Sequence, residues 1–124
     1  MHTEKTTWYN NMKLSIANDI LDIQFSTTEK ILAIHGSMQI PLSHITQATG
    51  MLLEPTWKQI RMPGTNLPGI IKAGTYYTNR GKEFWYLTRG NEVLRLELKD
   101  ESYDRIILGI KDSSFWTSRL GTTK

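Results

Sequence analysis

The side chains that most often carry out chemistry are sparse in this 124-residue chain and show no metal-binding or catalytic spacing. The chain has no cysteine, so disulfides and thiolate metal sites are excluded. His2, His35 and His44 do not have the spacing of metal ligands. Asp19 and Asp22 lie at a predicted turn and on the polar side of a predicted strand, where solvated carboxylates are expected. The sequence therefore predicts neither a metal site nor a cofactor.

Enzyme motifs are also missing from the sequence. There is no Gly-x-Ser-x-Gly elbow, no P-loop and no dinucleotide fingerprint. Thr7, Ser15, Ser37 and Ser43 have no recognisable base partner. We therefore expect a protein that is not an enzyme. Active sites assemble in three dimensions, so an enzyme or small-ligand carrier with a pocket at one open end of the fold stays an alternative.

Positive charge is concentrated in the middle of the chain. The net charge is +3, but residues 58–95 contain seven Lys and Arg against two Glu, whereas residues 1–57 contain three Lys against five acidic residues. The candidate anion- or partner-binding residues are Lys58, Arg61, Lys72, Arg80, Lys82 and Arg89. They either lie at solvated hairpin tips and edge strands or bind an anionic partner. That partner would be a phosphate-bearing ligand or an anionic membrane surface, where each residue adds about 1 kcal/mol. Nucleic acid ranks last, because the charge is low and no stacking motif is evident.

Residues 63–69 form a candidate partner loop. Their sequence is Pro63-Gly64-Thr65-Asn66-Leu67-Pro68-Gly69. Each Pro-Gly pair suits the two central positions of a type II turn, because proline presets φ and glycine accepts the positive φ that follows. The backbone explanation favours a stiff connection that fixes strand register. Recognition is the second interpretation, since loops on rigid scaffolds often carry binding.

Period-two alternation predicts a mainly β fold with a β-meander in its downstream half. Leu94, Leu96 and Leu98 would lie on one face of a strand, with Arg95 and Glu97 on the other. Predicted strands cover residues 84–88, 93–98 and 105–111, and the short gaps between them predict antiparallel neighbours. Upstream, strands are predicted at 13–16, 21–25, 31–34, 38–40 and 45–53, with a turn at residues 18–19 and a bulge or bend at Gly50.

Residues 112–120 are predicted to form a short helix, with Asp112 or Ser113 as the N-cap. Trp116 and Leu120 would share the face that covers one end of the sheets. Trp57 and Trp85, like Trp116, are expected in or beside the core. Residues 1–11 lack periodicity and are expected to be a flexible tail, residues 12–120 a single domain, and residues 121–124 a second tail.

Membrane-spanning segments are not predicted. The longest uninterrupted apolar runs are four residues, whereas a spanning helix needs about 20. The N-terminal residues lack the apolar stretch of a signal peptide, and the absence of cysteine suits a reducing compartment. We therefore expect a cytoplasmic location, which could include a peripheral association with a membrane.

Residues 60–120 resemble the bacterial pleckstrin-homology-like (PH-like) domain family. The resemblance is carried by residues 62–69, by Gly74-Thr75-Tyr76, by Gly81-Lys82-Glu83-Phe84-Trp85 and by the helix at 112–120. It implies a PH-like barrel of two roughly orthogonal antiparallel sheets, with about seven strands and one short C-terminal helix that plugs one end.

The same resemblance implies a function. It points to a non-catalytic binding or assembly module that acts through contacts with another protein or with copies of itself. Phosphoinositide-binding relatives place Lys and Arg in the loop between their first two strands, whereas residues 17–22 of this chain are acidic. Recognition of phosphoinositides in that way is therefore not expected. Peripheral binding to anionic phospholipid through the basic residues is the first alternative.

Overall fold

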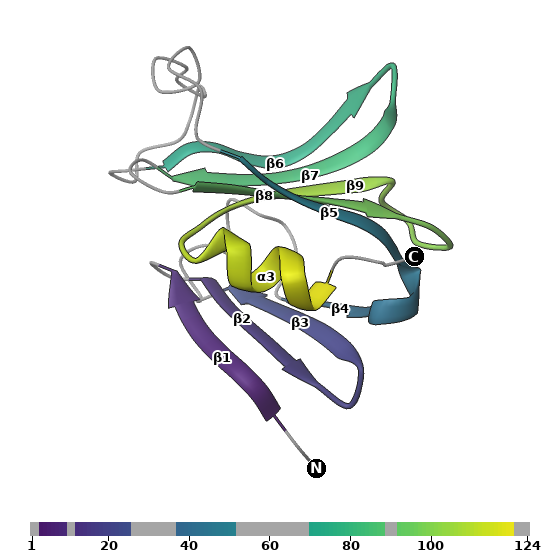
Figure 1. Cartoon of the computed structure of the whole chain (residues 1–124). Coiled ribbons are helices and arrows are strands. Elements are labelled where there is room, and N and C mark those ends of the chain that lie inside the picture. Colours follow the sequence, from purple (N-terminus) through teal and green to yellow (C-terminus); the bar gives the residue numbers. More distant parts are fainter. Residues whose placement is uncertain (1–2, 10–11, 26–36, 52–69, 89–91, 121–124) are drawn as a thin grey trace.

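The computed structural model describes residues 3–9, 12–25, 37–51, 70–88 and 92–120, which form nine strands and one α-helix (Figure 1). The elements are β1 (Thr3–Tyr9), β2 (Met12–Ala17), β3 (Ile20–Phe25), β4 (Ser37–Pro41), the 3₁₀ turn η1 (Leu42–His44), β5 (Ile45–Met51), β6 (Ile70–Thr78), β7 (Gly81–Thr88), β8 (Glu92–Leu98), β9 (Arg105–Ile110) and α3 (Ser113–Leu120). A mainly β fold with a C-terminal helix was predicted and is confirmed. Within the described residues, the nine strands exceed the expected seven or so.

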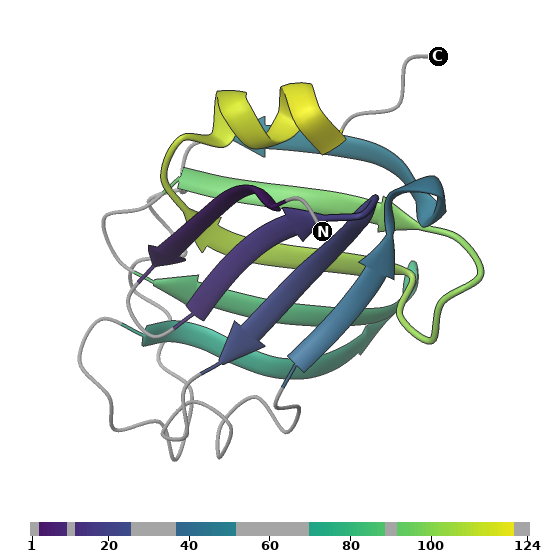
Figure 2. The same ribbon diagram turned by 90° about the horizontal axis from the view of Figure 1, so that it is seen from below.

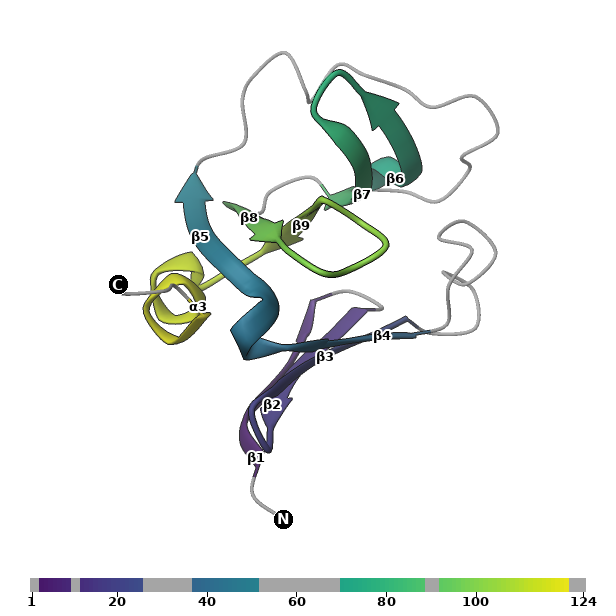
Figure 3. The ribbon, with the colours of Figure 1, turned by 90° about the vertical axis from the view of Figure 1, so that its right-hand side faces the viewer.

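The strands form two facing sheets. One has the order β1-β2-β3-β4 and the other the order β5-β8-β9-β7-β6. The chain passes from the first sheet to the second through η1, which joins β4 to β5 (Figure 3). Strands of the two layers run obliquely to each other (Figure 2). The described strands therefore make two separate sheets, and the closed barrel of the sequence prediction is not formed among them.

The core lies between the layers and is built from alternate residues. In β2 and β3 every second residue is buried, because successive side chains of a strand point to opposite faces. Phe25 of β3 joins the layers, with its ring centre 5.7 Å from that of Phe84 and 5.2 Å from that of Tyr86, both in β7. Both contacts are edge-to-face, the arrangement that aromatic rings prefer. From α3, Trp116 and Leu120 complete this core, as predicted.

The central strand of the second sheet is β9, and this corrects the predicted meander. β9 lies between β7 and β8, antiparallel to β8 as predicted but parallel to β7. Residues 106–110 of β9 are all buried, and a strand that is covered on both faces belongs in the middle of a sheet. A three-residue gap can cross the roughly 10 Å over one intervening strand, so a short gap did not require β7 and β8 to be neighbours.

The N-terminal region differs from the prediction as well. Residues Thr3–Tyr9 form β1, which pairs antiparallel with β2 and places Thr7 opposite Leu14. The expectation of an irregular tail over residues 1–11 is therefore wrong for this stretch. An edge strand pairs half of its backbone groups with its one neighbour and leaves the other half to solvent, so it can form without apolar alternation of its own. The predicted strand at 31–34 and the tail at 121–124 lie outside the described residues.

Two local predictions had different outcomes. Asn18 and Asp19 have φ angles of 54° and 61° and make the two-residue turn between β2 and β3, as predicted, because Asn and Asp tolerate left-handed backbone. Gly50, in contrast, lies in regular register, and the irregularity of β5 falls between Ile45 and Gln47. A Cβ at Gly50 would lie 2.9 Å from Cβ of Ser113, so this glycine allows α3 to approach β5.

Replacing Gly81 by alanine is expected to lower the free energy of unfolding by about 1–3 kcal/mol. Gly81 has a φ of 118°, and an added Cβ would overlap the Asp104 carboxylate. The same carboxylate accepts the Lys82 backbone N–H at 2.9 Å. Urea denaturation of Gly81→Ala, Asp104→Ala and the double variant separates overlap from backbone strain. If Gly81→Ala lowers the free energy of unfolding by the same amount in the Asp104→Ala background as in the wild type, overlap with the carboxylate is not the cause of the loss.

Candidate functional site

The outer face of the five-stranded sheet, which points away from β1–β4, carries a row of charged side chains. Strand register creates the row: Arg105 of β9 lies opposite Glu97 of β8 on one side and opposite Glu83 of β7 on the other. The residues next to them in each strand face the core, so these three must face outward. Sheet order therefore brings together two carboxylates and one guanidinium from three strands.

Arg105 is held by both carboxylates. Its Nη1 donates to Glu83 Oε2 at 2.7 Å, while its Nε and Nη2 donate to the two oxygens of Glu97 at 2.9 and 2.8 Å. The pair with Glu97 is bidentate, which is the strongest geometry for an arginine and a carboxylate. The side chains of Arg105 and Glu83 are 12% and 5% exposed. This row is an ionic network in which Arg105 and Glu83 have little contact with solvent, while Glu97 is 23% exposed.

Glu83 has further partners that keep it ionised. Trp85 Nε1 donates to Glu83 Oε1 at 2.9 Å, and Thr78 Oγ1 donates to Oε2 at 3.3 Å. Burial alone would raise the pKa of Glu83, but the hydrogen bonds from Trp85 and Arg105 and the positive charge of Arg105 outweigh it and hold the pKa below its usual value. Glu83 is therefore a carboxylate at neutral pH.

An apolar cluster lies beside the ionic network on the same outer face. In the register, Ile107 of β9 is flanked by Arg95 of β8 and Trp85 of β7. The buried members of the apolar cluster are Leu87, Val93 and Ile107, with Met51 and Trp85 packed against them. The outward side chains thus change from charged to apolar along each strand, from Glu83 to Trp85 in β7, from Arg95 to Val93 in β8 and from Arg105 to Ile107 in β9.

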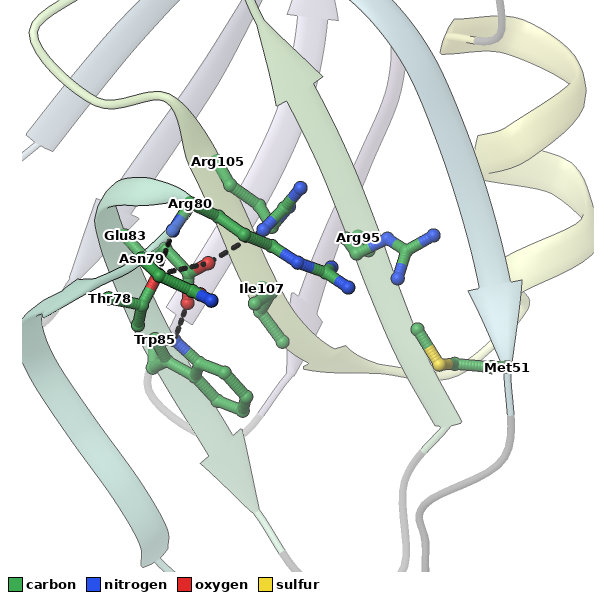
Figure 4. A pocket seen from close by; sticks show the side chains of 9 residues that line it. All are labelled: Met51, Thr78, Asn79, Arg80, Glu83, Trp85, Arg95, Arg105 and Ile107. Atoms are coloured by element: carbon green, nitrogen blue, oxygen red, sulfur yellow. Dashed lines mark hydrogen bonds and ion pairs between the residues drawn. The ribbon is translucent and has the colours of Figure 1, made fainter.

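A cavity of about 250 Å³ opens where the network and the apolar cluster meet (Figure 4). It is lined by Met51, Thr78, Asn79, Arg80, Glu83, Trp85, Arg95, Arg105 and Ile107. Arg80 comes from the turn between β6 and β7, and in Figure 4 its side chain extends over the sheet in the direction of Arg95. The cavity therefore has three arginines, one carboxylate and an apolar wall.

Arg95 and Arg80 are the less satisfied cations of the cavity. Arg95 Nε lies 3.3 Å from Glu97 Oε2, but this buried donor makes no hydrogen bond within the described residues. Both oxygens of Glu97 already accept from Arg105. The side chain of Arg80 is exposed and has no acidic partner among the described residues. Two of the three guanidinium groups can therefore accept a further anion.

The structure does not bring the described basic candidates together. Arg80 lines the cavity, whereas Lys82 Nζ lies 4.6 Å from the ring centre of Tyr103, on the side of β7 that Phe84 shares. Only the backbone of Lys72 is described. The other predicted candidates, Lys58, Arg61, Arg89 and residues 63–69, lie outside the described residues.

Sequence reasoning missed most residues of the cavity. It placed Arg95 and Glu97 correctly on the polar side of their strand, but it gave them no partners. The available signal was a charged residue on the polar side of each predicted strand or directly before it, namely Glu83, Arg95, Glu97 and Arg105. Trp85 was expected in or beside the core; it packs on the outer apolar cluster and lines the cavity.

A second carboxylate, Glu92, caps the start of α3. Its Oε1 accepts the Ser113 backbone N–H at 3.1 Å and also the Ser113 hydroxyl. Asp112, one of the two predicted N-cap residues, precedes the helix and accepts the Phe115 N–H through its carbonyl oxygen at 3.0 Å. The Ser113 hydroxyl, followed by its N–H, lowers the pKa of Glu92 because both donors favour the charged carboxylate.

The variant Ser113→Ala is expected to raise the Glu92 pKa toward its usual value, since it removes the hydroxyl donor. A depressed carboxyl pKa stabilises the fold above the unfolded-state pKa, and the effect is lost as the pH falls through the folded-state pKa. The dependence of stability on pH in that acidic range should therefore be smaller in Ser113→Ala. Carboxyl ¹³C NMR titration measures the Glu92 pKa directly, with Ser114→Ala as the control. Equal Glu92 pKa values in all three proteins would rule out this role for the hydroxyl.

Comparison of the chain with protein-family models, curated proteins and solved structures finds no match. The PH-like resemblance therefore remains a prediction from the residues quoted above. In the described segments, no helix combines the length and apolarity that crossing a bilayer demands. No group of three or more His, Asp or Glu side chains in those segments is arranged to hold a metal ion.

Proposed function

We propose that this chain is a non-catalytic binding module of the bacterial PH-like type and that its partner is a protein. The observation that carries the proposal is the outer-face cavity, which combines Arg80, Arg95 and Arg105 with Trp85. Arginine and tryptophan are among the residue types that dominate binding energy at protein interfaces, where they cluster in well-packed pockets. Recognition of acidic motifs by arginine clusters is a recurrent mode of peptide binding.

The core gives this surface role further support. Apolar side chains from both sheets and from α3 occupy most of the space between the two layers. The cavity at its β4 edge, lined among others by Gln39, Glu101 and Tyr103, is smaller than the outer-face cavity, at about 190 Å³. In the described part of the chain, Glu83 is the one charged residue that is buried, and it belongs to the outer face. A carrier or enzyme with its pocket at an open end of the fold would need convergent, strongly polar or charged groups there, whereas the arginines of the described residues gather at the outer-face cavity. Binding on the outside of the sheet is therefore the better-supported role.

Peripheral binding to anionic phospholipid is the alternative that the basic residues raised. A flat anionic surface attracts cations that point in one direction. Arg80 and Lys82, the two candidates with described side chains, lie on different sides of the β6–β7 hairpin. Their separation argues against one shared membrane-facing patch.

Site-specific photocrosslinking in cells that express the full chain tests the proposal. A benzophenone amino acid at Asn79, which is exposed and lines the cavity, should crosslink a discrete partner protein or a second copy of the chain. The same probe at Thr6, which is exposed in β1, serves as the control. The purified partner should then bind saturably to the wild-type chain and at least tenfold more weakly to Trp85→Ala.

Two outcomes contradict the proposal. Crosslinks that are the same from Asn79 and Thr6 would show that the outer face is not selective. Sedimentation with anionic vesicles at low salt, together with a monomeric chain and no crosslinked protein, would favour the phospholipid alternative instead.

A further inference from the structure

We propose that the outer-face cavity is a carboxylate site that receives the side chain of an Asp or Glu of the partner protein. The inference rests on the proposed function and specifies the chemistry of its recognition. Charge, hydrogen-bond donors and size each lead to the same class of ligand.

The charge of the cavity matches a single negative charge. Arg80, Arg95 and Arg105 face Glu83 in the lining, and Arg105 also binds Glu97. Three cations thus stand against two carboxylates, which leaves one positive charge in excess. Arg105 and its two carboxylates together carry a charge of −1, so the positive charge lies at Arg95, which also pairs with Glu97, and at Arg80. Two guanidinium groups in one cavity repel each other, and an anion placed at both replaces repulsion with attraction.

The hydrogen-bond donors of the cavity specify the anion further. Arg95 is paired with Glu97 at 3.3 Å and its side chain stays 29% exposed, while its Nε makes no hydrogen bond with the described residues. Its guanidinium therefore has donors to spare for a further acceptor. A planar carboxylate offers two oxygens that match the parallel donors of a guanidinium. The carboxylate of Glu83 already accepts from Arg105, Trp85 and Thr78. The incoming carboxylate is therefore directed to Arg80 and Arg95, away from Glu83.

The size of the cavity indicates one side chain rather than a larger molecule. Its volume of about 250 Å³ is below the roughly 300–1,000 Å³ of common small-molecule pockets. Trp85, Ile107 and Met51 provide an apolar wall for the methylene groups of a glutamate or for an apolar neighbour in the peptide. An acidic residue next to an apolar residue fits both halves of the cavity.

NMR titration of the full ¹⁵N-labelled chain tests this inference. The probes are acetyl-Leu-Glu-Leu-amide, the same peptide with Gln in place of Glu, and inorganic phosphate. The Glu peptide should shift the Nε–H signals of Arg80 and Arg95 and the indole N–H signal of Trp85 saturably. The Gln peptide should bind at least tenfold more weakly, because it lacks the charge-assisted hydrogen bonds. Phosphate should bind more weakly than the Glu peptide, because it cannot use the apolar wall.

Matched variants locate the site. Arg80→Gln and Arg95→Gln should each weaken binding of the Glu peptide about tenfold or more. Lys82→Gln removes the same charge from the same hairpin but on the other side, and its affinity should stay within twofold of the wild type. Arg95→Lys retains the charge and loses the planar fork, so it should fall between these. Thermal unfolding of each variant verifies that it is folded.

Each result decides the question. Equal affinity for the Glu and Gln peptides overturns the carboxylate assignment, and tighter binding of phosphate overturns the ligand class. Loss of binding in Lys82→Gln as large as in Arg95→Gln would place the anion elsewhere. If neither peptide binds while Asn79 still crosslinks a partner selectively, this inference fails and the proposed function stands. If the Glu peptide binds as expected but no selective partner exists, the carboxylate site stands and the proposed function fails.

Discussion

Replacing Arg105 by methionine is expected to lower the free energy of unfolding by about 3–5 kcal/mol. The substitution preserves most of the side-chain volume but leaves Glu83, which is 5% exposed, and Glu97 facing each other without their shared cation. Removing one partner of a buried ion pair is costly because the remaining charge stays dehydrated. The loss amounts to a large part of the total stability of a typical single domain, which is about 5–15 kcal/mol.

Urea denaturation at neutral pH measures the Arg105→Met effect. Lys99→Met is the control: Lys99 lies in the exposed loop after β8, and its substitution should change stability by less than about 0.5 kcal/mol. A change of similar size in both variants would show that the ionic network does not stabilise the outer face.

The same network predicts a dependence on pH. The pKa of Glu83 is depressed in the folded protein from the ordinary value of 4.5. Its stabilising contribution is therefore complete above that value and declines as the pH falls below it toward the folded-state pKa. Glu83→Gln carries no titrating group, so the stability difference between wild type and this variant should shift against the wild type on acidification. A difference that is constant with pH would contradict the ionised state of Glu83.

The variant Trp116→Ala is expected to lower the free energy of unfolding by about 3–5 kcal/mol. Trp116 is 0% exposed and belongs to the core between the layers, so the substitution leaves a large cavity where α3 packs against β5 and β8. Phe115→Ala, in the same helix turn, removes a ring that is 36% exposed and should have a much smaller effect. Urea denaturation compares the two variants. Equal losses would mean that helix content, rather than packing of the buried ring, sets the stability.

Much of the framework could be predicted from the sequence because burial has a period. Strands β2 and β3 alternate between apolar and polar residues, and their buried positions are the apolar ones. Trp116 and Leu120, four residues apart, identify the buried face of α3. In each case one local pattern determines both the element and the face that it buries.

Sheet order was not predictable in this way, and the candidate site depends on it. Glu83 meets Arg105 because β9 lies next to β7. In the predicted meander, β8 would separate these two residues. Alternation within a strand shows which residues face outward, but not which strand lies beside it. The partners of Arg95 and Trp85 likewise arise from pairing between distant segments. Arg80 was identified as a candidate from the local excess of positive charge, but the sequence did not show which residues would lie beside it.

The central position of β9 also has a consequence for synthesis on the ribosome. Until residues 105–110 have emerged, the native pairings of the second sheet are limited to β5 with β8 and β6 with β7, two separate ribbons with no ladder between them. Insertion of β9 joins them, and it also delivers Arg105 and Ile107 to the cavity. A nascent chain that stops before β9 therefore lacks the proposed carboxylate site, and binding of the Glu peptide would report that the sheet is complete.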